Sequence, residues 1–257
     1  MSAMTYAKPH EETALHTRML RLGLAEDESL TYWAHAARGL TPEQTFEAAF
    51  QERWFGGRTM ARVRYLVLNL QHRFDAFPEA LKTLARWMPT DVADRTVICH
   101  WHLQLSDPLY REFTSTVFAQ RWQRPTPTID RTAAVRWVEA KMEGRWSSST
   151  SQRMASGLLS TASEAGLCEP LKPIRTLAFP RVSDQALGYL LYLLRDIEFQ
   201  GSLQDNPYTQ SVGLDGELWQ QRVRKLPWVG YSRTGNVHDF KWQFDSLQDW
   251  ANEVLAS

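Results

Sequence analysis

A run of small hydrogen-bonding side chains between Trp146 and Leu167 is the segment of this chain best suited to binding chemistry. If the segment is a helix, with about 100° between successive residues, one side of it is apolar and the other is polar. The apolar side carries Met154, Leu158, Ala162 and Ala165, and the polar side carries Ser149, Gln152, Arg153, Ser156, Ser160 and Ser163. Short hydroxyls let a helix approach a surface closely, and Ser, Gln and Arg donate to phosphates and base edges. The pattern therefore predicts a helix that contacts DNA.

The flanking segments predict a helix-turn-helix with a strand behind it. Residues 131–142 form an amphipathic helix that ends at Gly144, and the serine run supplies an N-cap for the next helix. Gly166 ends that second helix, and 174–179 has strand character between two prolines. This order is typical of a winged helix. The alternative is a plain helical hairpin whose serine face is only solvated.

We expect the residues that contact DNA in this region to lie on the second helix, at its start and beside it. They are Arg145, Ser147, Ser149, Thr150, Gln152, Arg153, Ser156 and Arg175.

A second basic element precedes it in the chain. Five arginines and no acid lie between Glu52 and Asp75, and residues 59–74 have a helical apolar face. We expect this helix to hold DNA phosphates through a stripe of arginines. The stripe comprises Arg58, Arg62, Arg64 and Arg73. The alternative is an ordinary solvated face, or ion pairing with the acidic first helices.

The whole chain predicts a mainly α protein of two lobes. Its 257 residues are 43% hydrophobic, enough for a substantial core, and the 29 basic and 29 acidic residues cancel, so net charge favours no partner. Expected helices are 11–22, 29–38, 42–53, 59–74, 78–87, 92–105, 108–122, 131–142, 183–199, 214–226 and 246–255, with a β-hairpin formed by 228–232 and 237–244. The prolines in 124–128 predict a linker between a helical bundle, 1–123, and a winged-helix-like domain, 129–257, that ends in a helix-hairpin-helix extension.

The sequence offers little for catalysis. Cys99, His100 and His102 are adjacent, but no second pair follows at metal-binding spacing, and their neighbours have core character at helical spacing. We therefore expect no metal, no cofactor and no enzyme activity, with a metal or hydrolytic enzyme around these histidines as a rival hypothesis. The two distant cysteines predict a reducing cytoplasm, and no apolar stretch approaches the roughly 20 residues that cross a bilayer.

Three segments resemble the BrxA family of bacteriophage exclusion (BREX) defence systems. They are RVRYLVLNLQHRFDAFPEALKTLARW (62–87), the helical pair that follows through Trp122, and RWSSSTSQRMASGLLSTASEAGL (145–167). The resemblance extends over residues 11–200 and is weaker in the aromatic C-terminal part. It implies a helical N-terminal lobe, a winged-helix-like part, double-stranded DNA binding and a role in phage defence alongside other defence proteins. A rival expectation is an assembly subunit that docks larger defence enzymes without touching DNA.

Overall fold

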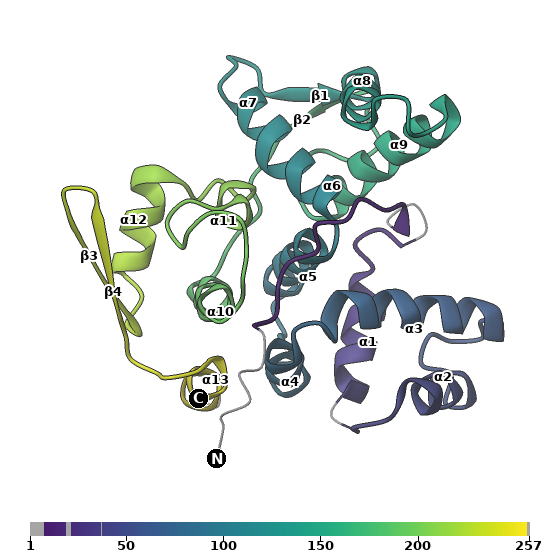
Figure 1. Ribbon diagram of the computed structural model, residues 1–257, viewed down its shortest axis with the longest axis horizontal. Helices are drawn as coiled ribbons and strands as arrows, with labels where there is room; N and C mark the ends of the chain where they lie inside the picture. Colours follow the sequence, from purple (N-terminus) through teal and green to yellow (C-terminus); the bar gives the residue numbers. More distant parts are fainter. Residues whose placement is uncertain (1–7, 19–21, 37, 256–257) are drawn as a thin grey trace.

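The computed structural model describes residues 8–18, 22–36 and 38–255, and it confirms a mainly α fold (Figure 1). The first half contains α1 (Glu26–Ala36), α2 (Pro42–Gln51), α3 (Met60–Phe74), α4 (Pro78–Trp87), α5 (Val92–Ser106), α6 (Pro108–Glu112), a π-helical turn (Phe113–Val117) and α7 (Phe118–Trp122). The second half contains β1 (Thr128–Asp130), α8 (Arg131–Met142), α9 (Ser148–Glu164), β2 (Ile174–Thr176), α10 (Asp184–Arg195), α11 (Pro207–Gln210), α12 (Gly216–Arg224), β3 (Val229–Thr234), β4 (Val237–Trp242) and α13 (Leu247–Val254).

Local capping explains why many helix starts follow from the sequence. Thr41 forms a reciprocal capping box with Gln44 at the start of α2, and Asp107 accepts a hydrogen bond from Tyr110 N at the start of α6. Both caps precede a proline at the first helical position, where its missing N–H costs nothing. The single helix expected over 108–122 is α6, the π turn and α7 in continuous succession.

The helix expected over 11–22 is wrong for the part that the structure describes. Residues 11–17 run as an extended segment, and 19–21 lie outside the described residues. Tertiary contacts hold this segment, because Glu11 N donates to Glu198 O and Glu12 N donates to Leu105 O. The helix expected over 29–38 begins earlier, at Glu26, and ends at Ala36; residue 37 lies outside the described residues.

The strands form two small antiparallel pairs. The hairpin β3–β4 confirms the expected hairpin, with Thr234 opposite Val237 across the turn. The strand expected over 174–179 is shorter, and β2 pairs with β1, the strand before α8, with Ile129 opposite Arg175. After α9, Cys168 forms an antiparallel bridge with Leu177, and Glu169 N donates to Thr176 O. A short hairpin-like pairing of 167–169 with 176–178 therefore follows the α8–α9 pair and lies beside the two-stranded sheet of β1 and β2.

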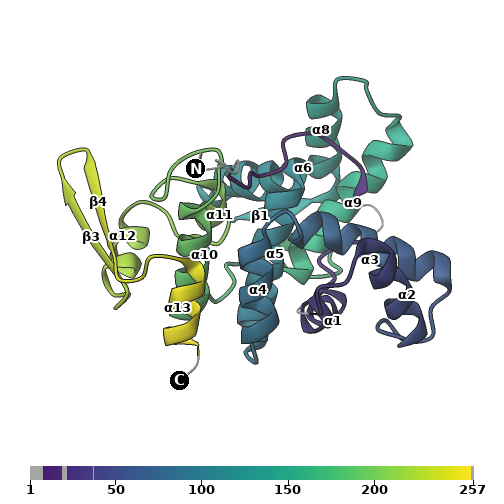
Figure 2. The same cartoon turned by 60° about the horizontal axis from the view of Figure 1, so that its bottom comes forward.

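One hydrophobic cluster extends from Leu22 to Ala251 and includes residues from both sides of the predicted linker. Helix α5 lies within it, with Trp101 fully buried and donating its indole N–H to Tyr208 O. Figures 1 and 2 show α5 between the α10–α13 region on one side and α1 and α3 on the other. The lobes 1–123 and 129–257, whose outermost residues 1–7 and 256–257 lie outside the described part, stay a prediction.

In the described part of the chain, every helix is too short or too polar to cross a membrane.

Candidate nucleic-acid interface

Helices α8 and α9 pack against each other across the short turn at 143–147. Met154, Leu158 and Ala162 of α9 are completely buried, and so are Ala134 and Val138 of α8. Burying this apolar side leaves the serine-rich side of α9 facing outward. Ser147 begins α9, because its Oγ accepts a hydrogen bond from Thr150 N at 3.2 Å.

The outward side of α9 carries most of the predicted contact residues. Ser147, Ser149, Gln152 and Arg153 are exposed, and Thr150 and Ser156 are half-buried. The first turn of α9 contains no acidic residue of its own, and the carboxylate nearest to it in the chain's contacts is Glu139 of α8, whose Oε1 accepts a hydrogen bond from Ser148 Oγ at 3.5 Å. Among the described residues Arg153 has no hydrogen-bond or ion-pair partner, which leaves its guanidinium available to a ligand.

Two arginines of α8 join this surface, although the sequence analysis did not single them out. Arg131 and Arg136 are exposed and line a shallow hollow together with Gln152 and Glu139. Arg131 Nε donates to Ser156 Oγ at 3.1 Å, so the start of α8 is held against the middle of α9. The places of these two arginines in the helical pattern, away from the positions of buried Ala134 and Val138, could have identified them from the sequence.

The two arginines that flank α9 have different environments. Arg145 is exposed near the start of α9, and its Nε donates to Met142 O at the end of α8. Arg175 is half-buried, and its Nη1 donates to Leu159 O at 2.7 Å and to Ser163 Oγ at 2.6 Å. These hydrogen bonds hold β2 against the last turns of α9, and the expected DNA contact of Arg175 stays a prediction.

Three of the four arginines expected in the second basic element lie on the surface of or beside α3. Arg58, Arg62 and Arg64 are exposed; Arg62 lies over the Tyr65 ring and Arg64 over the Phe46 ring. Both views of the molecule place α9 and the α2–α3 pair toward the same, right-hand side (Figures 1 and 2). A duplex bound along that side would have both basic elements within its reach.

Arg73, the fourth arginine expected in the stripe, does not lie on the surface of α3. Its side chain is only 3% exposed, and its guanidinium donates to Leu24 O at 2.6 Å and to Gly23 O at 3.0 Å. A buried guanidinium that satisfies backbone carbonyls cannot contact DNA phosphates. The helical spacing that aligned Arg73 with Arg62 gave no information on what packs against that turn of α3.

The Cys99–His102 segment belongs to the core, as expected. Cys99, His100 and His102 are fully buried, and burial raises the pKa of Cys99 to about 12 and lowers the pKa of each histidine to about 3. His100 is hydrogen-bonded to Tyr110 Oη and Ser211 Oγ, each at 2.9 Å, and His102 to Tyr189 Oη at 2.6 Å. His100 and His102 are therefore neutral, buried side chains that pack and form hydrogen bonds within the core.

The protein is thus mainly helical, and its packed helices α8 and α9 present a polar surface with exposed arginines. The BrxA family model matches residues 16–190, which is more than half of the chain, and the protein belongs to the BrxA family. This membership places it in the BREX phage-defence systems, among other defence proteins.

A solved structure has a similar fold. It is an uncharacterized protein from Magnetospirillum magneticum, 18% identical in sequence, with a TM-score of 0.59 over 72% of this chain and 99% of that one. At this identity the likeness concerns the fold alone. The comparison with curated proteins gives no match.

Proposed function

We propose that this protein is a non-catalytic, double-stranded DNA-binding component of a BREX system, acting in the cytoplasm. The observation that carries the proposal is the outward side of α9, where exposed Gln152 and Arg153 lie on a helix whose own first turn contains no acidic residue. Such groups donate to phosphates and to base edges, and a helix of this kind enters the major groove in helix-turn-helix proteins. The topology β1–α8–α9–β2 supports a winged-helix-like fold in which the short hairpin formed by 167–169 and 176–178 takes the place of the wing.

The contacts divide into two kinds. We assign Ser149, Gln152 and Arg153 to the groove, and Arg131, Arg136 and Arg145 to the phosphates on either side. Exposed Arg58, Arg62 and Arg64 would hold the backbone further along the duplex, since helix α3, on or beside which they lie, is on the same side of the molecule as α9 in Figure 1. A surface of this kind binds by charge and shape, and its affinity depends strongly on salt.

Charge reversal on α9 tests the proposal. Gln152→Glu with Arg153→Glu adds two carboxylates to the outward side without touching the buried side at Met154 and Leu158. We expect duplex affinity in a gel-shift titration to fall at least about tenfold, equivalent to about 1.4 kcal/mol, with little change in thermal midpoint.

The control is a matched pair on the far side of the molecule. Gln221 and Arg224 are exposed on α12, on the opposite side from α9 in Figure 1. Gln221→Glu with Arg224→Glu changes the net charge by the same amount and should leave duplex affinity within about twofold. Equal losses in both double variants would show that net charge alone matters, and no loss on α9 would remove this helix from the interface.

A second candidate function is an adaptor that docks a larger defence protein. The hairpin β3–β4 projects from the body of the molecule (Figure 1), and Val237 at its tip is 69% exposed. A projecting hairpin of this kind is accessible to a protein partner. Wild-type protein that shows no salt-dependent retention on duplex DNA would favour this function over DNA binding.

A further inference from the structure

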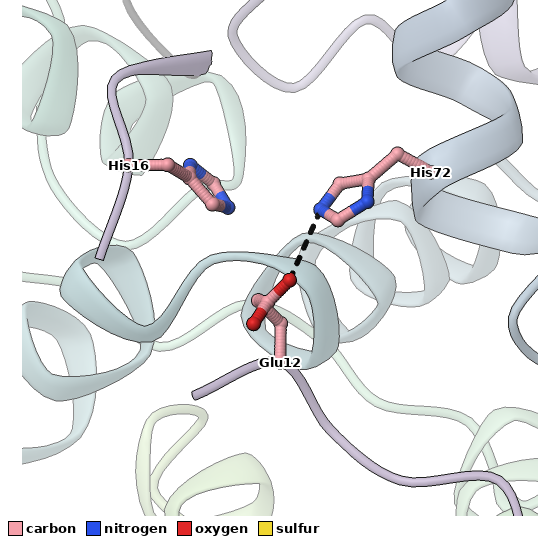
Figure 3. Close-up of side chains that lie close together, drawn as sticks. All are labelled: Glu12, His16 and His72. Carbon is pink, nitrogen blue, oxygen red and sulfur yellow. Dashed lines mark ion pairs between the residues drawn. The ribbon is translucent and has the colours of Figure 1, made fainter. Parts of the chain in front are cut away.

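Two histidines and a glutamate from distant parts of the chain meet at the surface between the N-terminal segment and α3. Glu12 and His16 come from the extended segment before α1, and His72 comes from the last turn of α3 (Figure 3). One ligand atom from each lies within 4.8 Å of the other two, and all three side chains are half-buried. The sequence separates His16 and His72 by more than 50 residues, so no local spacing reveals the cluster.

A backbone carbonyl completes the group. Ser106 O, at the end of α5, lies 2.9 Å from His16 Nε2 and 3.4 Å from His72 Nε2, while His72 Nε2 is 3.9 Å from Glu12 Oε2. Four ligands at about 2.0–2.1 Å from a tetrahedral zinc ion lie roughly 3.3 Å from one another. These separations therefore need only small adjustments to surround one ion.

Two buried polar atoms behind His16 are unsatisfied, and they point to a ligand on its other nitrogen. Asp107 Oδ2 and His16 Nδ1 face each other at 3.6 Å, and neither has a hydrogen-bond partner. In the neutral ring that donates Nε2–H to Ser106 O, both facing atoms are acceptors. A metal on Nε2 would shift the proton to Nδ1, which would then donate to Asp107, as carboxylates commonly receive from metal-bound histidines.

A cation from the protein already occupies this position. Arg18 Nη1 lies 2.6 Å from His72 Nε2 and 4.0 Å from Glu12 Oε2, so the lone pair of His72 is directed into the cluster. The Arg18 side chain is 48% exposed, and it can swing into solvent when another cation takes its place. Glu12 stays oriented through Oε1, which accepts hydrogen bonds from the backbone N–H groups of Thr13 and Ala14.

We propose that Glu12, His16 and His72, together with Ser106 O, form a site for a divalent transition metal, with Zn²⁺ the ion that two imidazoles and a carboxylate suit best. This revises the sequence-based expectation of no metal site. The ion would link the N-terminal segment to α3 and to the junction of α5 and α6. It would cross-link these elements, which are otherwise joined there by Arg18 and a few hydrogen bonds.

Equilibrium dialysis and thermal unfolding of the full chain test this proposal. Protein stripped with EDTA should take up one Zn²⁺ per chain, and its thermal midpoint should rise with added ZnCl₂ because the ion binds only the folded state. Ca²⁺ and Mg²⁺ at the same concentration should leave the midpoint unchanged, since they prefer all-oxygen ligands.

Two variants and a control identify the ligands. His72→Ala and Glu12→Gln should each weaken Zn²⁺ binding at least tenfold, and Glu12→Gln retains the size of the side chain should the histidine variant fold poorly. His10→Ala, an exposed histidine of the same segment, should bind as wild type. No saturable Zn²⁺ uptake by wild-type protein, or unchanged affinity in both ligand variants, would overturn the proposal.

Discussion

Arginines of this protein have different roles that depend on how deeply each side chain is buried. Arg73 and Arg175 hold backbone carbonyls, whereas Arg153 faces solvent without a partner among the described residues. The sequence predicts a DNA contact for all three. The spacing of charges on a helix predicts which residues share a face, but the neighbour that covers the face comes from elsewhere in the chain.

The buried Arg73 guanidinium leads to a prediction of stability. Arg73→Ala leaves the carbonyls of Gly23 and Leu24 without their donor and removes the positive charge near buried Asp107. We expect a loss of about 2–4 kcal/mol in the free energy of unfolding, measured by urea denaturation. Arg64→Ala on the exposed part of α3 should cost less than about 0.5 kcal/mol, and equal losses in the two variants would contradict this account.

The buried histidines predict a specific acid sensitivity. Burial lowers the pKa of His100 and His102 to about 3, so the folded protein keeps both neutral while the unfolded chain takes up protons below about pH 6.5. Stability is therefore unaffected above that pH and is lost as the pH falls toward 3, by about 1.4 kcal/mol per pH unit for each histidine.

His102→Gln should make this loss less steep, because glutamine can still bond Tyr189 Oη but takes up no proton. The measurement is the free energy of unfolding between neutral pH and pH 4 for both proteins. Parallel curves would show that His102 is not among the groups that destabilise the fold in acid.

At the scale of elements, the sequence predicts helices well where their start signals are local. Thr41, Asp107 and Ser147 each cap the helix that the pattern predicts. The helix expected over 11–22 does not form in residues 11–17, where Glu11 makes tertiary contacts instead. Its carboxylate instead accepts from Gln200 N and from the Tyr208 hydroxyl and pairs with Arg111, and such long-range contacts are invisible to helical periodicity.

Helix α3 carries a prediction of its own. Arg58→Ala with Arg62→Ala removes two exposed charges and should weaken binding to all duplex sequences alike. If these residues contact phosphates, the slope of log affinity against log salt should flatten by roughly one to two units. Arg224→Ala with Arg233→Ala, in α12 and β3, is the control, and a slope unchanged by the α3 variant would assign Arg58 and Arg62 to solvent.

At the scale of the whole molecule, the core joins segments that the sequence would divide. The cluster around α5 takes side chains from both sides of the predicted linker, and α10 and α13 pack beside it. Helices α3, α8 and α9 all contribute side chains to this one core, which fixes their positions relative to one another. The site on α9 could be predicted because it occupies one helix, whereas Arg131, Arg136 and the Glu12–His16–His72 cluster needed the fold.

The measurement that tests the central claim most directly is the salt dependence of duplex DNA binding by the wild-type protein. Gel-shift titrations on duplex DNA, single-stranded DNA and RNA at several salt concentrations give affinity and slope together. We expect the duplex to bind best and its log affinity to fall linearly with log salt, with a slope of several units for the arginines assigned here. Absence of duplex binding at low salt, or an affinity independent of salt, would contradict a DNA-binding function.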